Sequence, residues 1–180
     1  MQTPFLIGPR LYFRPLERGD ARKLVTYLND PAVRRMLLFH RPMSVGQEEG
    51  FLEALGKDEH QVRLGIARHA EDELIGSVGL HKLDFRGRHA ELGLVIGERS
   101  AWGQGFGTEA TRLMLDYGFG TLNLHRIWLQ VYASHAAAIR VYEKAGFRKE
   151  GVQREHLFAE GRHEDAVLMG ILRSEWTPLL

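Results

Sequence analysis

The sequence contains no cysteine, which excludes disulfide bridges, thiol nucleophiles and cysteine-bound metals. It also lacks an apolar run close to the ~20 residues of a membrane-spanning helix, and its N-terminal stretch lacks the pattern of a signal peptide. Neither sign of charge prevails, because 24 Lys and Arg residues face 23 Asp and Glu residues. A balanced charge disfavours binding to nucleic acid or to an anionic membrane. We therefore expect a cytoplasmic protein with neither kind of partner.

The chain nevertheless has enough apolar residues, 44% of 180, for one domain with a substantial core. Helix-type and strand-type patterns alternate along it without a linker, which predicts a mixed α/β fold. Strands are expected at 10–16, 62–68, 73–83, 89–97, 126–132, 152–158 and 166–172, and helices at 20–28, around 33–37, and at 44–55, 106–119 and 136–145.

Three glycines, Gly103, Gly105 and Gly107, stand directly before the helix expected at 106–119. The first N–H groups of a helix have no intrahelical partner and lie at the positive end of its dipole, so this turn could bind a phosphate or pyrophosphate. A plain structural turn is the alternative. No lysine follows as in a Walker A loop, and Thr108 stands where a dinucleotide fingerprint needs glycine.

A second motif, SHAAAIRVYEKAGF at 134–147, is a short helix that Gly146 ends as a C-cap. A glycine turn followed about forty residues later by Tyr-Glu-Lys-Ala-Gly-Phe resembles the GNAT superfamily of N-acetyltransferases. Within it, the chain is similar to the branches that acetylate ribosomal-protein N-termini and spermidine or other diamines. The resemblance implies one α/β domain over residues 1–180, with a mixed, mostly antiparallel, splayed sheet flanked by helices and with acetyl-CoA as co-substrate.

The resemblance also implies where acetyl-CoA binds. In the family the amides of the glycine turn hold the pyrophosphate, and the strand before the turn pairs with the pantetheine arm. Trp102 and His135 depart from the family pattern, which has Gln or Arg at the first position and often Asn at the second. The expected cofactor-binding residues are Val95, Ile96, Gly97, Trp102, Gly103, Gln104, Gly105, Phe106, Gly107, Thr108, His135 and Ala138.

Two residues are candidates for catalysis. Tyr142 matches the family's general-acid tyrosine, and its phenol is protonated at neutral pH, so it can donate to the leaving thiolate. A core tyrosine is the alternative. Glu91 lies in an otherwise apolar strand where some members carry a catalytic glutamate, and it could accept the amine proton. It could equally face solvent. The histidines show no metal-binding spacing, and we expect no metal.

The acceptor is the least defined part of the site. Glu49 and Glu53 are i, i+4 neighbours on one helix and could steer a cationic amine. Alternatively, they could belong to the solvent-exposed face of that helix. Phe85 could line an acceptor pocket or belong to the core. The sequence thus predicts direct acetyl transfer to a primary amine, either a peptide N-terminus or a polyamine. An antibiotic or amino sugar is the alternative acceptor, a non-catalytic acyl-CoA-binding regulatory domain is the alternative of another class, and a homodimer is possible from the family.

Overall fold

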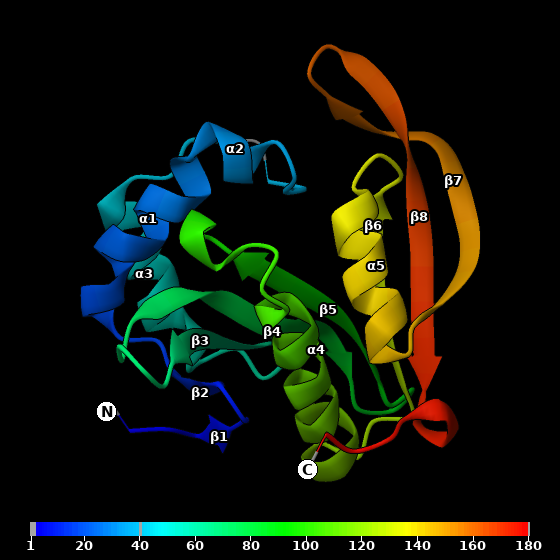
Figure 1. Cartoon of the computed structure of the whole chain (residues 1–180), viewed down its shortest axis with the longest axis horizontal. Helices are drawn as coiled ribbons and strands as arrows, with labels where there is room; N and C mark the ends of the chain where they lie inside the picture. The colour runs from blue at the N-terminus through cyan, green and yellow to red at the C-terminus, as the bar shows by residue number, and fades with distance from the viewer. Residues whose placement is uncertain (1–2, 40, 180) are drawn as a thin grey trace.

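The computed structural model describes residues 3–39 and 41–179, and in these residues one eight-stranded sheet forms the centre of the molecule (Figure 1). The strand order is β1-β2-β3-β4-β5-β6-β8-β7. Neighbouring strands are antiparallel, except that β5 and β6 are parallel. The strands are β1 (Leu6–Ile7), β2 (Leu11–Pro15), β3 (Val62–Arg68), β4 (Leu74–Asp84), β5 (His89–Ile96), β6 (Arg126–Tyr132), β7 (Arg148–Ala159) and β8 (Arg162–Leu172).

The α-helices begin and end at residues suited to those positions. Ser44 caps its helix with a reciprocal capping box, in which the Gln47 amide donates to Ser44 Oγ and the Ser44 amide to Gln47 Oε1. Gly146 ends the last helix in the left-handed conformation, with φ of 104°. The helices are α1 (Ala21–Asn29), α2 (Pro31–Arg34), α3 (Val45–Leu55), α4 (Phe106–Leu115), which continues as a π-helical turn (Asp116–Thr121), and α5 (Ala136–Ala145).

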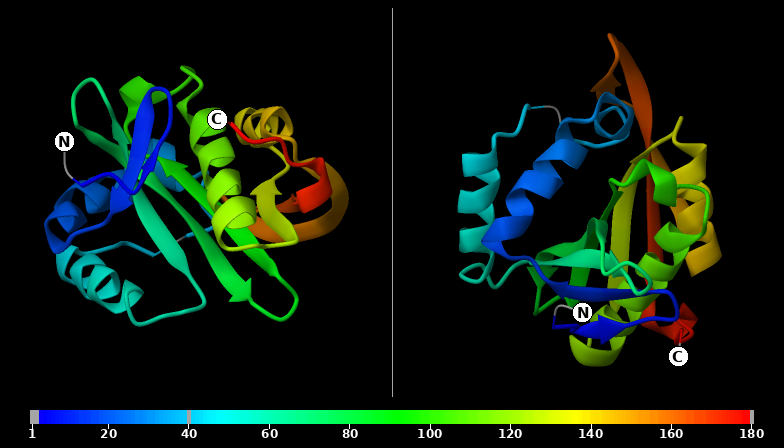
Figure 2. Two further views of the ribbon diagram at one scale, coloured as in Figure 1. Left: turned by 90° about the horizontal axis from the view of Figure 1, so that it is seen from below. Right: turned by 60° about the vertical axis from the view of Figure 1, so that its left-hand side comes forward.

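The helices cover the two faces of the sheet unequally (Figure 2). On one face α4 and α5 pack over the main core, which includes Leu80, Leu92, Met114 and Ile127. On the other face, α1 and α3 close a smaller cluster around Leu24 that also contains Leu52 and Leu74. We call this second face the front face. It is covered over β3 and β4 by α1 and α3 and is left more open at β5 and β6.

The structure confirms the expected fold class and most of the expected elements. Strands 62–68 and 126–132 and helix 136–145 have the predicted bounds. The helical region around 33–37 is shorter than expected, because α2 ends at Arg34. The last two strands are longer than expected, because two β-bulges let β7 continue across its polar residues. The two-residue strand β1 was not predicted.

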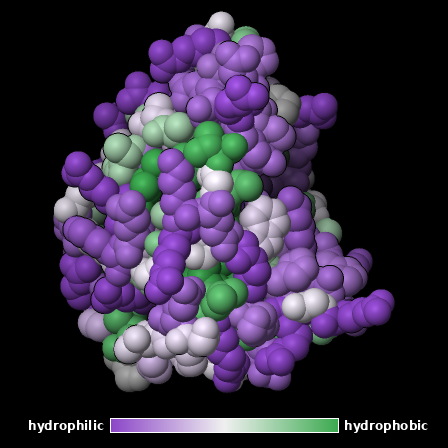
Figure 3. All heavy atoms as spheres, turned by 90° about the vertical axis from the view of Figure 1, so that its right-hand side faces the viewer, coloured by the Kyte–Doolittle hydropathy of each residue, from purple (hydrophilic) through white to green (hydrophobic). Residues whose placement is uncertain are grey.

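Strand β7 forms one edge of the sheet, and most of its side chains are exposed. The side of the molecule that carries β7 and β8 is largely hydrophilic, with hydrophobic residues gathered in smaller groups between the hydrophilic ones (Figure 3). Val152 on β7 is 42% exposed, and Phe158 near its end is 61% exposed. Among the residues described, no helix is both long and apolar enough to cross a membrane.

Candidate active site

Strands β5 and β6 lie side by side for only three residue pairs and then separate. The parallel register joins His89 to Arg126, Ala90 to Ile127 and Glu91 to Trp128, and it stops there. Past Glu91, strand β5 pairs only with β4, and past Trp128, strand β6 pairs only with β8. The sheet therefore contains a fork that opens toward the end of β5, as the splayed sheet of the sequence analysis predicted.

The open edge of β5 offers backbone hydrogen-bonding groups to a ligand in the fork. The Gly97 amide donates to the Ile75 carbonyl on β4, so alternate residues of β5 direct their backbone groups the same way. By this alternation, Leu94 and Ile96 direct their groups into the fork and Val95 directs its groups at β4. A Cβ on Gly97 would lie 2.1 Å from the Tyr27 ring, so this glycine is needed for packing.

In this register Leu94, which sequence reasoning missed, presents its backbone groups to the fork together with Ile96, whereas Val95 and Gly97 direct theirs at β4. The placement of Val95, Ile96 and Gly97 beside the cofactor stays a prediction. Trp102 is connected to the same edge, because its indole Nε1 donates to the Ile96 carbonyl at 2.8 Å. Trp102, which departs from the family pattern, thus connects the glycine turn to β5 by a hydrogen bond. The bond uses the Ile96 carbonyl, and the Ile96 amide stays directed into the fork.

The glycine turn has a conformation suited to an anion. Gly103 and Gly105 have φ of 72° and 85°, which L side chains rarely adopt, and Gly105 is the N-cap of α4. The next three amides, of Phe106, Gly107 and Thr108, precede the first N–H that bonds within the helix. The turn therefore presents backbone donors at the positive end of a ten-residue helix.

Arg10, just before β2, contacts this turn through its guanidinium group. Its Nη1 donates to the Gln104 carbonyl at 2.9 Å, and its guanidinium lies over the Phe106 ring. The buried Glu109 of α4 accepts from Arg10 Nε at 2.8 Å and from the Arg10 and Leu11 amides. These bonds join the N-terminal part of the chain to the start of α4.

Helix α5 packs beside α4. The helix and its N-cap residue carry the remaining residues predicted to bind acetyl-CoA. Its N-cap residue, His135, is half-buried, and burial lowers the pKa of its imidazole. Ala138, one turn later, packs against the main core. A Cβ on Gly107 would lie 3.5 Å from Val141 of α5 and 3.8 Å from Leu94 of β5, so α4, α5 and β5 converge at this point.

Tyr142 of α5 is buried against the ring of Phe147, and burial raises the pKa of its phenol to about 12. Its hydroxyl has no hydrogen-bond partner in the part of the chain that the structure describes. A protonated phenol without a partner is suited to donate to a ligand atom.

The front face at the fork carries polar side chains. Glu91 forms an ion pair with Lys82, whose Nζ lies 2.8 Å from Glu91 Oε2. The same ammonium lies 5.3 Å from the centre of the Trp128 ring. His81 is the cross-strand partner of Glu91, so the two side chains lie on one face. Sequence reasoning missed His81 because neighbouring strands cannot be put in register from residue patterns alone.

The structure does not bring the predicted acceptor residues to this place. Glu49 and Glu53 both form ion pairs with Arg18, at 2.9 and 3.2 Å. Phe85 is 57% exposed in the turn between β4 and β5, against the ring of His60. That turn precedes β5 and the fork opens at the end of β5, so Phe85 lies at the opposite end of the strand from the opening. The roles of Glu49, Glu53 and Phe85 toward the acceptor stay predictions.

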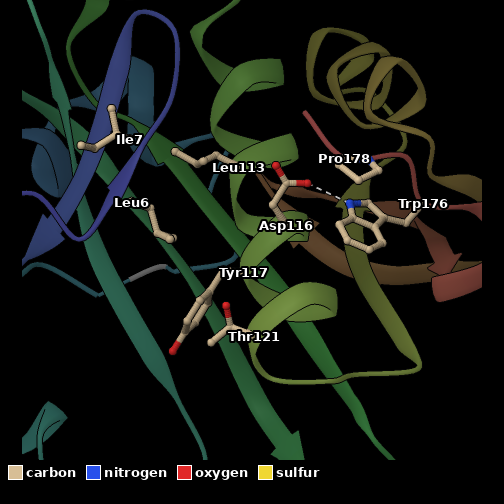
Figure 4. Close-up of a pocket in the computed structure, with 8 residues that line it drawn as sticks. All are labelled: Leu6, Ile7, Leu113, Asp116, Tyr117, Thr121, Trp176 and Pro178. Carbon is tan, nitrogen blue, oxygen red and sulfur yellow. Dashed lines mark hydrogen bonds between the residues drawn. The ribbon is translucent and has the colours of Figure 1, made fainter. Parts of the chain in front are cut away.

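A hollow of about 340 Å³ lies elsewhere, between β1, the end of α4 and the C-terminal segment (Figure 4). Inside it, Asp116 accepts from the indole Nε1 of Trp176 at 2.9 Å, and Leu6, Tyr117 and Pro178 help to line the walls. None of the predicted site residues lines this hollow. In the described residues, no three His, Asp or Glu side chains gather as a metal site would require.

Comparison with known proteins agrees with this geometry. The family model of the acetyltransferase (GNAT) domain matches residues 10–148. The chain belongs to the GNAT acetyltransferase family. The chain is therefore an acetyltransferase that transfers an acetyl group to an amine.

Relatives of this GNAT chain include proteins with named acceptors. The spermidine N(1)-acetyltransferase of Vibrio cholerae is 33% identical over 94% of this chain and 97% of its own. A Bacillus subtilis protein named as a ribosomal N-acetyltransferase, YdaF, is 34% identical over 59% of this chain and 57% of its own. The crystal structure of the Vibrio spermidine N-acetyltransferase with CoA and spermine has a TM-score of 0.86 at 32% identity, covering 92% of this chain and 96% of that one.

Proposed function

We propose that this GNAT enzyme transfers the acetyl group of acetyl-CoA directly to the α-amine of a peptide N-terminus, within a ternary complex. The donor half of the proposal is supported by the turn at Gly103 and Gly105, by the open backbone edge at Leu94 and Ile96, and by the unpaired hydroxyl of Tyr142. A chain without cysteine has no thiol to carry an acyl-enzyme, which favours direct transfer.

The acceptor half is carried by the charges on the front face. Several carboxylates that face it or border it already contact a cation of the chain. Glu48 lies 3.3 Å from Arg63, Glu91 lies 2.8 Å from Lys82, and Glu164 lies 3.0 Å from Arg162 and also accepts from Ser134. A polyamine carries several ammonium groups and needs unpaired acids at matching distances.

The segment that follows α2 supports the same choice. It crosses toward β6, where the Tyr132 hydroxyl lies 3.4 Å from the Leu37 carbonyl. Three exposed arginines, Arg34, Arg35 and Arg41, lie in or beside this segment. Their positive charge disfavours a polycation and favours a peptide with acidic residues after its N-terminus.

Spermidine is the second candidate acceptor, and the named activity of the Vibrio cholerae relative favours it. For either acceptor, the proposed role of Tyr142 is to donate a hydrogen bond to the sulfur that leaves, and the backbone amides of the glycine turn hold the pyrophosphate. Glu91 is the sequence-based candidate for the base. A homodimer also stays a prediction, drawn from the family resemblance.

The acceptor is tested by following thiol release from acetyl-CoA with a matched panel of amines. The panel contains peptides with acidic and with basic residues after the N-terminus, the same peptides Nα-acetylated, spermidine, and an aminoglycoside. We expect the acidic peptide to give the highest kcat/KM and its Nα-acetylated form to give none. A higher kcat/KM for spermidine than for every peptide contradicts the proposal and selects the polyamine.

A further inference from the structure

The imidazole of His81 lies on the front face where β5 begins to separate from β6. In the register of β4 with β5, His81 is opposite Glu91, the last residue of β5 that pairs with β6. The ring extends from there over Gly93, since a Cβ on Gly93 would lie 2.9 Å from His81 Nε2 and 3.1 Å from Cδ2. Glycine at 93 therefore leaves room for the ring at the inner end of the fork.

The ring is half-buried, and neither of its nitrogens has a hydrogen-bond partner within residues 3–39 and 41–179. The charged groups around it are Arg63 on β3, Glu91 on β5 and Lys82 on its own strand. Burial lowers the pKa of His81, and the positive charges of Arg63 and Lys82 lower it further, while Glu91 opposes them. The imidazole is thus neutral at neutral pH and has a nitrogen lone pair available.

Glu91, the base expected from the sequence, is in a different situation. Lys82 Nζ already occupies one of its oxygens at 2.8 Å, and the Trp128 ring lies against that ammonium. An acceptor amine arriving as an ammonium ion would compete with Lys82 for this carboxylate. His81 has no ion-pair partner to compete with the amine in the part of the chain that the structure describes.

We propose that His81 is the catalytic residue that takes the proton from the acceptor amine. This inference rests on the proposed function, but it holds for a peptide and for spermidine alike, since each arrives as R–NH₃⁺. His81 accepts one proton, and the neutral nitrogen then forms the C–N bond with the thioester carbonyl. As the tetrahedral intermediate collapses, the C–S bond breaks, the nitrogen loses its second proton and the sulfur gains one. The proton on His81 returns to solvent, so one proton is released per acetyl group transferred.

The proposal makes a specific prediction for the pH profile of kcat/KM. With His81 as base, the enzyme uses the ammonium form of the amine, so kcat/KM is level between the lowered pKa of His81 and the pKa of the amine. In His81→Gln only amine that is already neutral in solution can react. Its kcat/KM should then rise tenfold per pH unit up to the pKa of the amine, and at pH 7 should be about 10²- to 10⁴-fold below wild type.

The experiment compares three variants with whichever amine of the panel wild type acetylates. His89→Gln is the matched control, because this histidine is 40% exposed at the start of β5 and should keep the wild-type profile. Glu91→Gln tests the rival base. Titration calorimetry with acetyl-CoA, run on every variant, shows whether the donor site is intact.

Loss of the level region in His81→Gln with unchanged acetyl-CoA affinity supports the proposal. It is overturned if Glu91→Gln alone loses the level region, if the wild-type profile already rises tenfold per pH unit from pH 6.5, or if His81→Gln no longer binds acetyl-CoA. Turnover of spermidine instead of peptides overturns only the proposed acceptor. Turnover of no amine overturns both.

Discussion

Replacing Tyr142 by phenylalanine removes one hydroxyl from a buried position and tests how the thiolate leaves. The pKa of Tyr142 is about 12, so at pH 8 only about one molecule in 10⁴ carries a phenolate. A thiol has a reference pKa of about 8.5, and full proton transfer from such a phenol to a thiolate is therefore uphill by about 3.5 pKa units, or ~5 kcal/mol. We expect Tyr142 to act by donating a hydrogen bond to the charge that develops on sulfur.

Loss of one such positioned donor costs about 10²- to 10³-fold in kcat, which corresponds to ~2.7–4 kcal/mol. Tyr142→Phe should show this loss with an almost unchanged affinity for acetyl-CoA, measured by thiol release and titration calorimetry. Tyr117→Phe is the matched control, because Tyr117 is equally buried but lines the hollow beyond α4. A kcat within a few-fold of wild type, or equal losses in kcat and in acetyl-CoA affinity, would refute a role at the sulfur.

The same tyrosine makes stability depend on alkaline pH. The folded pKa of about 12 is above the reference value of about 10 for the unfolded chain, so the stabilisation is fully present below pH 10. It is lost as pH rises through 12, by up to ~2.7 kcal/mol. Denaturant titrations between pH 9 and 12 should show this loss in wild type and a smaller one in Tyr142→Phe.

The remaining predictions concern the donor site. Gly105→Ala places a Cβ at φ of 85° and 3.3 Å from Arg10 Nη2, so the KM for acetyl-CoA should rise and stability should fall by ~1 kcal/mol, whereas Gly151→Ala, with open space around it, should change neither. Trp102→Phe removes the indole donor to Ile96, and the KM for acetyl-CoA should rise about threefold to tenfold with an unchanged kcat, as expected for the loss of one hydrogen bond. An unchanged KM in either donor-site variant would contradict the assignment of that residue.

Local patterns predicted the elements well because they depend on neighbouring residues. The alternation of apolar and polar residues in 126–132 and the apolar stripe of the helix that ends before Gly146 can each be recognised from a short stretch of sequence. The glycine turn was predictable for the same reason, since its chemistry comes from the start of one helix.

The parts that sequence missed depend on register and on distant partners. Whether Leu94 or Val95 directs its amide into the fork depends on how β5 is aligned with β4, and a shift of one residue would exchange them. The pairing of Glu49 with Arg18, and of Glu91 with Lys82, likewise follows from tertiary placement. The sequence identified carboxylates, but whether each one is available for a substrate depends on the cations beside it.

The hydrogen bonds from Arg10 to the glycine turn and to Glu109 couple the first strands to the start of α4 thermodynamically. Arg10 and Gln104 are 94 positions apart, so the turn acquires its outer support only after β2 has joined the sheet. A ligand that binds the turn only when Arg10 contacts it also stabilises the pairing of β2 with the sheet, by mass action. Bound acetyl-CoA should therefore slow hydrogen exchange in β2, and a donor-site ligand would protect the beginning of the chain from local unfolding and proteolysis.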